Sequence, residues 1–232
     1  PTSEATTYEK WFKKLGSGWG AAPSVQIIVD NSLIVMSANH IYKLDLNTGD
    51  ILQTGDMVAA TNFGYTPPTY ADGMIFAPLA DGRVQAFNAE TLESLWVYQD
   101  TLKGQSLSPI TYSDGYIYTG FWNAETKDAN YVCIPVTDED PTNAQEAKEA
   151  AWQYTSLGGF YWAGSVVRGD YVVFGTDDGT SGSDGTGHVL SLNGSSAIIR
   201  YYCYIPCTST LLQATACHIF HTLYVLSFLI CY

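Results

Sequence analysis

The stretch that decides the fold is Gly82-Arg-Val-Gln-Ala-Phe-Asn-Ala-Glu-Thr-Leu-Glu-Ser-Leu-Trp96. Apolar and polar side chains alternate on both sides of a polar turn, which is the pattern of two short antiparallel strands. Another pair of apolar runs precedes it, joined by Asp72-Gly73, a dipeptide that accepts the positive φ of a two-residue hairpin. Residues 66–98 are therefore predicted to form a unit of four antiparallel strands.

Three further segments repeat the first hairpin of this unit. Residues 27–35, 109–118 and 165–174 each contain an apolar run, a tight turn and another apolar run. The four turns are about 42, 42 and 55 residues apart along the chain. Four short strands repeated at such intervals are typical of the blades of a β-propeller.

We therefore expect an all-β protein, a β-propeller of four-stranded antiparallel blades near residues 21–53, 66–98, 107–155 and 163–194. Trp11 precedes the first unit much as Trp96 precedes the third, and we interpret it as part of the closing strand of a preceding unit. Because propellers need four to eight blades to close, about four visible blades indicate an incomplete or open propeller.

The run from Gly82 to Trp96 resembles the repeat of the PQQ-like β-propeller family, which reads roughly Gly-x-Val-x-Ala-Leu-Asp-Ala-x-Thr-Gly-x-x-x-Trp. Residues 45–49 repeat its turn as Asp-Leu-Asn-Thr-Gly, with Gln53 at the position of the Trp. The resemblance covers about residues 8–194. It implies that Trp96 and Trp152 pack between neighbouring blades, where large aromatic side chains supply buried area.

The resemblance also bears on cofactors. Quinoprotein alcohol dehydrogenases of this superfamily hold pyrroloquinoline quinone (PQQ) with vicinal cysteines, a stacking Trp and a calcium site with a catalytic Asp. This sequence contains no Cys-Cys pair and no matching calcium constellation, so we expect no cofactor and a non-catalytic protein. Two alternatives stay open: a fragment of a PQQ-dependent dehydrogenase that would use PQQ and calcium, and a scaffold for protein assembly in the cell envelope.

Charge and composition indicate which class of partner is disfavoured and where the protein is located. The 23 Asp and Glu against 10 Lys and Arg give a net charge of −13, which disfavours nucleic acid as a partner. The scarcity of Lys fits an exported protein, extracellular or in the cell envelope. The chain begins at Pro1 without a basic and then apolar leader, so we expect a processed product or a fragment.

One face of the expected propeller collects aromatic side chains. The loops between the second and third strands share that face with the loops that link blades, and two insertions, residues 121–130 and 176–187, fall in such loops. We expect a binding rim there for protein or cell-wall polysaccharide. The rings predicted to form it are Trp19, Tyr65, Trp122, Tyr161 and Trp162. The alternative is that these rings pack beneath the loops.

Two inserted segments carry further expectations. Asp177, Asp178 and Asp184 could ligate calcium through carboxylate oxygens, and the alternative is an ordinary solvated loop, because Asp, Gly and Ser also dominate turns. Residues 138–151 are predicted to contain one short helix, since Asp140 can cap it, Pro141 suits its first turn and Ala, Glu, Gln and Lys follow.

Residues 195–232 form a hydrophobic tail that departs from the repeat. The tail has no Asp, Glu, Lys or Gly, and it holds four of the five cysteines: Cys203, Cys207, Cys217 and Cys231. A zinc site, a membrane anchor and a non-native, out-of-frame continuation are the three interpretations. The apolar run of residues 223–232 is too short for a clear membrane span, which needs roughly 18 residues or more.

Overall fold

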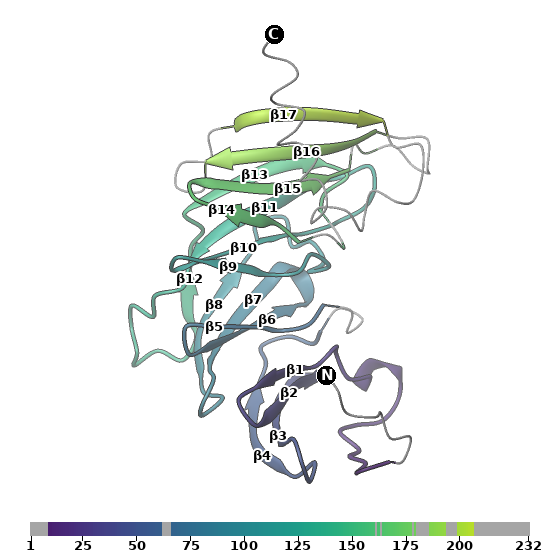
Figure 1. Ribbon diagram of the computed structural model, residues 1–232, viewed down its shortest axis with the longest axis vertical. Helices are drawn as coiled ribbons and strands as arrows, with labels where there is room; N and C mark the ends of the chain where they lie inside the picture. The colour runs from purple at the N-terminus through teal and green to yellow at the C-terminus, as the bar shows by residue number, and fades with distance from the viewer. Residues whose placement is uncertain are drawn as a thin grey trace, which may run out of the picture.

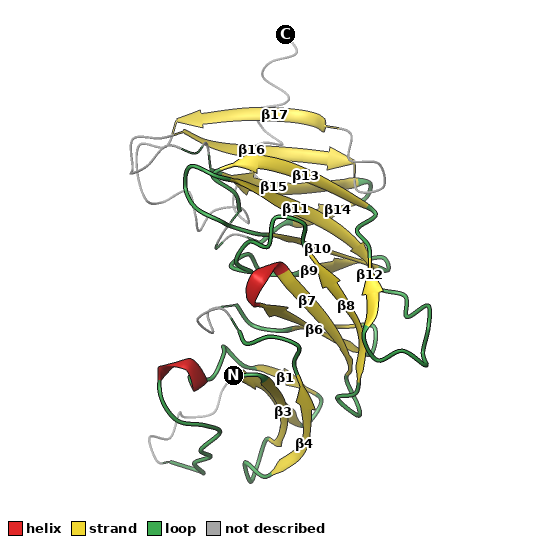
Figure 2. Cartoon of the chain, turned by 180° about the vertical axis from the view of Figure 1, so that it is seen from behind, coloured by secondary structure: helices red, strands yellow, loops and turns green. Residues whose placement is uncertain are grey.

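The computed structural model describes residues 9–61, 66–160, 162, 164–177, 179, 186–193 and 199–206. These residues form four β-sheets and two 3₁₀ turns, η1 (Trp19–Ala21) and η2 (Ala80–Gly82), as Figures 1 and 2 show. The all-β prediction is therefore confirmed. Within the described ranges, no helix has the length and apolar character needed to cross a membrane.

Each sheet is built from consecutive hairpins. Blade 1 consists of β1 (Ile27–Val29), β2 (Ser32–Ser37), β3 (His40–Asp45) and β4 (Ile51–Asp56). Blade 2 consists of β5 (Thr69–Ala71), β6 (Met74–Leu79), β7 (Arg83–Asn88) and β8 (Ser94–Gln99), with β12 (Glu146–Lys148) added beside β8. Blade 3 consists of β9 (Thr111–Ser113), β10 (Tyr116–Gly120), β11 (Asp128–Pro135) and β13 (Trp152–Leu157). Blade 4 consists of β14 (Val166–Arg168), β15 (Tyr171–Thr176), β16 (Thr186–Asn193) and β17 (Ile199–Pro206).

The blades are arranged radially, with their first strands innermost. β1 lies against β5, β5 against β9 and β9 against β14, so the first strands of successive blades meet along a common line. The sheets stack face to face from blade 1 to blade 4 in Figure 1. This arrangement makes the four sheets blades of one open propeller, as predicted.

Three apolar cores fill the seams between blades. The seam of blades 1 and 2 buries Ile34, Met36, Ile41, Ile75, Phe87 and Leu92. The seam of blades 2 and 3 buries Phe76, Trp96, Phe121 and Ile134 among others. The seam of blades 3 and 4 buries Tyr131, Cys133, Trp152 and Phe174. Trp96 and Trp152 thus pack between blades, which is the role that the repeat pattern implied.

The turns between third and fourth strands follow one design in blades 1 and 2. Asp45 Oδ1 accepts the backbone N–H groups of Asn47 and Thr48 at 2.7 and 2.8 Å. Asn88 Oδ1 accepts the corresponding N–H groups of its own turn at 2.8 and 3.0 Å. A short polar side chain at the end of the third strand therefore shapes each turn, as such side chains do elsewhere.

Trp11 differs from its prediction in one respect. Residues 9–16 are not in a strand, so the predicted closing strand is wrong. The indole nevertheless donates its N–H to the carbonyl of Leu46 at 3.2 Å, and an added Cβ on Gly49 would lie 2.4 Å from its ring. The described chain has no adjacent strand for this segment to pair with, but the side chain still covers blade 1.

The predicted helix within residues 138–151 is also wrong. Two successive turns run through it instead: Asn143 N–H donates to the carbonyl of Asp140 at 2.8 Å, and Glu146 N–H donates to that of Asn143 at 2.9 Å. β12 then pairs in parallel with β8 (Figure 2). Pairing with an open sheet edge outweighs the weak helix propensity of the local sequence.

Blade 4 extends beyond residue 194, where the repeat pattern was predicted to end. β17 pairs antiparallel with β16 and completes a sheet of four strands. Part of the predicted tail is thus the fourth strand of the last blade. The other tail expectations, including those on Cys207, Cys217 and Cys231, lie outside the described residues.

Candidate functional site

Loops from blades 2 to 4 join into one surface, here called the loop face: residues 100–108, 121–127, 158–160, 162 and 177. Gln105 and Trp122 exchange backbone hydrogen bonds of 2.7 and 3.0 Å, which tie the linker of blades 2 and 3 to the β10–β11 loop. Phe160 N–H donates to the carbonyl of Phe121 at 2.9 Å and connects the next linker. The predicted gathering of linkers and second-to-third strand loops on one face is therefore present.

Trp162 is the most prominent ring of the loop face. Its side chain is 58% exposed, and its backbone has a φ of 60°, in the left-handed region that bulky residues rarely adopt. The backbone N–H of Trp162 donates to the carbonyl of Leu107 at 3.2 Å. The linker of blades 2 and 3 thus holds this exposed indole in a strained backbone conformation.

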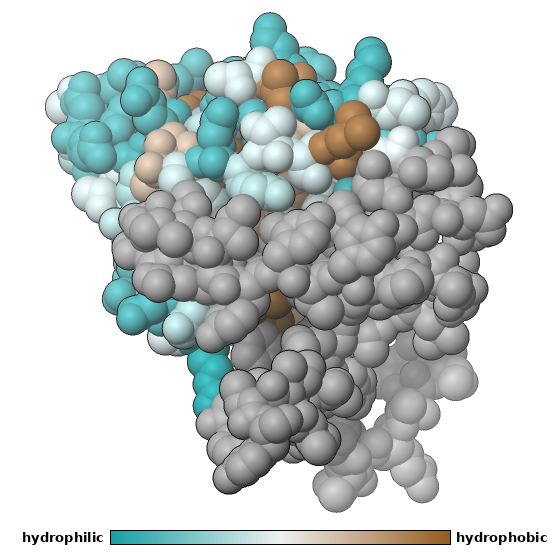
Figure 3. All heavy atoms as spheres, turned by 90° about the horizontal axis from the view of Figure 1, so that it is seen from above, coloured by the Kyte–Doolittle hydropathy of each residue, from teal (hydrophilic) through white to brown (hydrophobic). Residues whose placement is uncertain are grey.

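The other predicted rim residues fall into three groups. Trp19, in η1 before blade 1, is 84% exposed, whereas Trp122 is half-buried against the linker of blades 2 and 3. Tyr65 and Tyr161 lie outside the described residues. Phe160, a further ring of the linker between blades 3 and 4, is buried and packs beneath the loops. The described part of the surface seen in Figure 3 is mainly hydrophilic, with a few hydrophobic residues among it.

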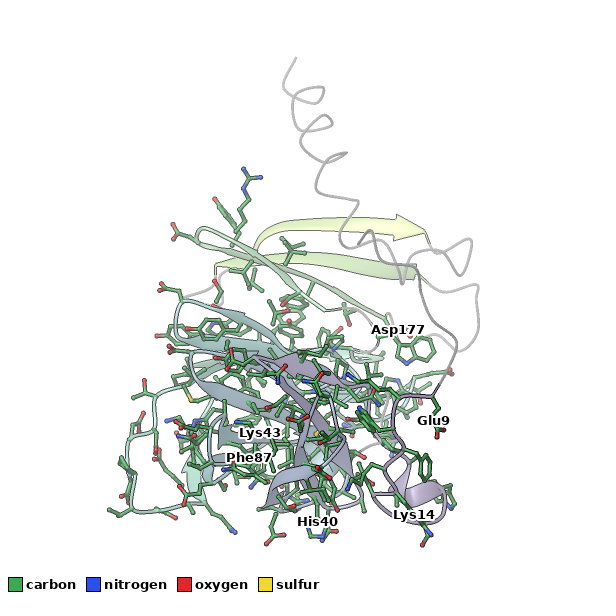
Figure 4. All side chains as sticks on the ribbon, turned by 60° about the horizontal axis from the view of Figure 1, so that its bottom comes forward. Glu9, Lys14, His40, Lys43, Phe87 and Asp177 are labelled. Atoms are coloured by element: carbon green, nitrogen blue, oxygen red, sulfur yellow. The ribbon has the colours of Figure 1, made fainter. Side chains whose placement is uncertain are left out.

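The predicted calcium ligands are only partly described. Asp177 is half-buried, its N–H donates to the carbonyl of Gly159 at 3.2 Å, and its Oδ1 accepts the Gly179 N–H at 3.1 Å. Asp178 and Asp184 lie outside the described residues. Among the residues that are described, no three His, Cys, Asp or Glu side chains gather in a way that could hold a metal ion. Figure 4 shows Asp177 on the same side of the view as Glu9 and Lys14.

A buried polar network supports the loop face and was not anticipated from the sequence. Asp100 is fully buried; its Oδ1 accepts Asn130 Nδ2 at 2.9 Å and its Oδ2 accepts the Leu102 N–H at 3.0 Å. Thr155 donates its hydroxyl to Asn130 Oδ1 at 2.6 Å. Burial, and then the Asp100 charge, raise the pKa of Tyr98 far above its usual range. The only local signal was an Asp directly after a closing strand.

These contacts make the network a brace and not a reactive centre. A buried carboxylate that already accepts several hydrogen bonds is held in one geometry. Cys133 lies in the seam of blades 3 and 4, where burial raises the pKa of its thiol to about 12, so this sulfur stays protonated and poorly nucleophilic at neutral pH. The described residues therefore present a scaffold with exposed rings.

Comparison with known proteins agrees with this architecture. The sequence model of the family described as outer membrane protein assembly factor BamB matches residues 3–125. No curated protein matches the chain.

Solved structures share the fold at low sequence identity. BamB from Moraxella catarrhalis superimposes with a TM-score of 0.53 at 18% identity, over 77% of this chain and 47% of that one. A europium-containing methanol dehydrogenase gives 0.61 at 15% identity, over 85% and 45%. Quinohemoprotein alcohol dehydrogenase ADHIIG from Pseudomonas putida HK5 gives 0.59 at 14% identity, over 80% and 34%. The chain thus spans less than half the length of each, and these likenesses concern the fold alone.

Proposed function

The chain belongs to the family described as outer membrane protein assembly factor BamB, and on that premise we propose that it is a non-catalytic module of the cell envelope whose loop face binds another protein. The exposed indole of Trp162 is the observation that carries the proposal. A half-exposed Trp in a left-handed backbone conformation costs about 1–3 kcal/mol in isolation. Such strain is typical of positions that serve binding, and Trp is among the residues that contribute most to protein interfaces.

The surroundings of Trp162 suit a preformed contact surface. Its anchor, Leu107, lies in the same linker as the Gln105 that bridges to Trp122. Beneath, Phe121 and Phe160 are buried and Asp100 is braced by hydrogen bonds. These buried residues hold the loop face in one conformation, so less conformational entropy is lost on binding and the exposed rings contribute more to affinity. Trp19 is a second exposed ring, carried by the segment that precedes blade 1.

The test compares rings on two faces of the propeller. Trp162→Ala changes the loop face, and Trp19→Ala changes the same side of blade 1, because Ser37 at the β2–β3 loop donates its hydroxyl to the carbonyl of Ala21 in η1. Tyr116→Ala changes a partly exposed ring beside the Asp114-Gly115 turn, on the opposite face. Retention of solubilised envelope proteins on immobilised chain, quantified by mass spectrometry, should fall with the first two variants and not with the third. Equal retention by all variants would exclude the loop face. Retention of purified cell-wall polysaccharide, abolished by Trp162→Ala, would identify a glycan as the partner instead.

The dehydrogenase alternative receives no support from the described residues. The sequence has no adjacent cysteine pair, and Cys133 is buried in a seam. Among the described residues no group of three His, Cys, Asp or Glu side chains could hold a metal ion, and the absence of PQQ and calcium stays a prediction. Dye-linked alcohol oxidation after addition of PQQ and calcium would overturn the non-catalytic proposal.

A further inference from the structure

Blade 2 has five strands in the described part of the chain, where each of the other blades has four. β12 pairs in parallel with the outer edge of β8, with Ala147 opposite Val97, Glu146 opposite Trp96 and Lys148 opposite Tyr98. The strand comes from the loop that follows β11 of blade 3, and it forms the outer margin of blade 2 in Figure 2. The outer edge of a blade in this protein is thus able to accept an extended segment.

Side chains secure that added strand. Lys148 is buried; its Nζ donates to the carbonyl of Thr137, contacts Glu139 Oε1 at 3.2 Å and Glu146 Oε1 at 3.4 Å, and lies 5.9 Å from the centre of the Trp96 ring. In strand addition, the backbone hydrogen bonds supply the affinity, and side-chain contacts near the edge determine which segment binds.

β4 is the counterpart of β8 in blade 1. The carbonyl of Asn39 accepts the backbone N–H of Met57 at 2.8 Å, and the carbonyl of Gly82 accepts that of Asp100 at 2.8 Å. In an antiparallel pair, successive residues point their backbone groups alternately toward the partner strand and away from it, so these two bonds fix which residues of β4 and β8 point outward. Thr54 lies three residues before Met57, and Val97 lies three residues before Asp100. By this alternation, the backbone N–H and C=O of Thr54 point away from β3, and those of Val97 point away from β7. Thr54 therefore presents the backbone groups that Val97 presents to β12.

The outer edge of β4 carries a bulge at Leu52, but from Gln53 to Asp56 the strand pairs with β3 in regular register and its outer side is open. In the described part of the chain, no strand pairs with its outer side, and the strand contains no Lys and no Pro. Leu52 is 51% exposed and the Asp56 side chain is 90% exposed, although Asp56 also contacts His40 Nδ1 at 2.9 Å. An edge whose outer backbone groups are open in this way is a template for strand addition.

The geometry points to the outer edge of β4 as a second binding site, for an extended partner segment that pairs in parallel and carries an apolar side chain four residues before a Lys or Arg. Residues 53–55 of β4 correspond to the β8 residues that pair with β12, so the apolar side chain would lie near the bulged Leu52 at one end of this run and the basic one beside Asp56 at the other. The net charge of −13 favours a basic segment over an acidic one. This site is separate from the loop face.

The probe is the capped peptide Thr-Leu-Thr-Val-Thr-Lys-Thr, and its reversed sequence is the control of equal composition. Titrated into the isotopically labelled full chain, the peptide should shift the amide signals of residues 52–56. Thr54→Pro removes the outward donor and should weaken binding about tenfold or more, whereas Thr54→Val keeps it and should bind within about twofold of the wild type. Pro is tolerated at edge positions, so the blade is expected to fold.

Two further variants test the side-chain contact at Leu52 and the independence of this site from the loop face. Leu52→Lys leaves the backbone intact and should also weaken binding, because it removes the apolar contact with the Leu of the peptide and places a charge beside that side chain instead. Trp162→Ala should leave peptide binding unchanged, which separates this site from the proposed loop-face function. Equal affinity for Thr54→Pro and Thr54→Val, equal affinity for the reversed peptide, or shifts confined to other residues would each overturn the proposal.

Discussion

The indole N–H of Trp96 donates to the backbone carbonyl of Val136 at 3.0 Å, across the seam between blades 2 and 3. Val136 is the first residue after β11, the third strand of blade 3. Leu46 has the corresponding place after β3 of blade 1, and its carbonyl accepts the indole N–H of Trp11 at 3.2 Å. One hydrogen bond is therefore repeated at equivalent places in the propeller, and it ties each blade to the segment before it.

Removing the Trp96 donor while keeping an aromatic ring should destabilise the protein. Trp96→Phe leaves the buried carbonyl of Val136 without its indole donor, which costs about 1–3 kcal/mol in free energy of unfolding, in addition to the loss of packing volume. Urea denaturation followed by circular dichroism measures this. Trp19→Phe is the matched control, since that ring is exposed, and it should change stability by less than about 0.5 kcal/mol. Equal effects of the two changes would contradict the seam bond as a source of stability.

The seam of blades 1 and 2 uses a different donor at the same place. Ala89 is the first residue after β7, and its carbonyl accepts Lys43 Nζ at 3.1 Å. Lys43 also donates to the carbonyl of Glu90 at 3.2 Å. Gln53, opposite Lys43 in the sheet, stands where the repeat pattern has Trp. A lysine on the third strand thus replaces an indole on the fourth.

If Lys43 takes the place of the indole, then a Trp at position 53 should restore the stability that is lost when Lys43 is replaced. Lys43→Met should lower the free energy of unfolding by about 0.5–1.5 kcal/mol, because the Ala89 carbonyl loses its ammonium donor. Adding Gln53→Trp should recover most of that loss, since an indole at the closing position can reach the same carbonyl. Denaturation of the two single variants and the double variant forms a thermodynamic cycle with a favourable coupling between the sites. Strictly additive effects would show that the lysine does not replace the indole.

Leu92 presents a conflict between strain and burial. It has a φ of 57° where blade 1 has Gly49 at 73°, yet it is buried in the core between blades 1 and 2. Leu92→Gly relieves strain of order 1 kcal/mol, but it removes a buried leucine side chain worth about 2–5 kcal/mol. The lost burial outweighs the relieved strain, so this variant should be less stable by thermal denaturation. A rise in Tm would mean that backbone strain dominates at this turn.

The repeated blades could be predicted because their signals are local. The hairpins depend on residues such as Asp72 and Gly73, which take φ values of 53° and 71°, and on capping side chains such as Asp45. Trp96 could be assigned to a seam because the closing residue of a repeat has a fixed place. The exposed rings Trp19 and Trp162 were also predicted as rim residues, but their use in binding stays a prediction.

The remaining features depend on contacts that no local pattern encodes. Residues 138–151 have helical composition, but the open edge of β8 recruits residues 146–148 as a strand. β17 lacks the Trp that marks the closing strands β8 and β13, and it is recognised only by its pairing with β16. Asp100 becomes important because Asn130, thirty positions later, donates to it. Such long-range partners decide what sequence periodicity leaves undetermined.

The segment that carries β12 has carboxylates with opposite pKa shifts. Glu146 Oε2 accepts the Asp140 N–H at 2.7 Å and the Glu139 N–H at 3.0 Å. The Asp140 hydrogen bond first, and then nearby Lys148, hold the pKa of Glu146 below its usual 4.5 despite partial burial. Burial, and then the Glu146 charge, raise the pKa of Asp138 above its usual 3.8.

The sign of each shift predicts how β12 responds to acid. The lowered pKa of Glu146 means that its stabilisation is complete above pH 4.5 and is lost as pH falls through the lower folded value. The raised pKa of Asp138 acts oppositely, because its contribution is present at low pH and is lost as pH rises. Because the two contributions oppose each other, the Glu146 effect is measured in the Asp138→Asn variant, where hydrogen exchange of residues 139–148 should accelerate on acidification after correction for the intrinsic pH dependence of exchange. Glu146→Gln should make exchange faster at neutral pH and less dependent on acid, and Asp138→Asn should slow it at neutral pH. An unchanged acid response in the Glu146→Gln variant would show that another group controls the strand.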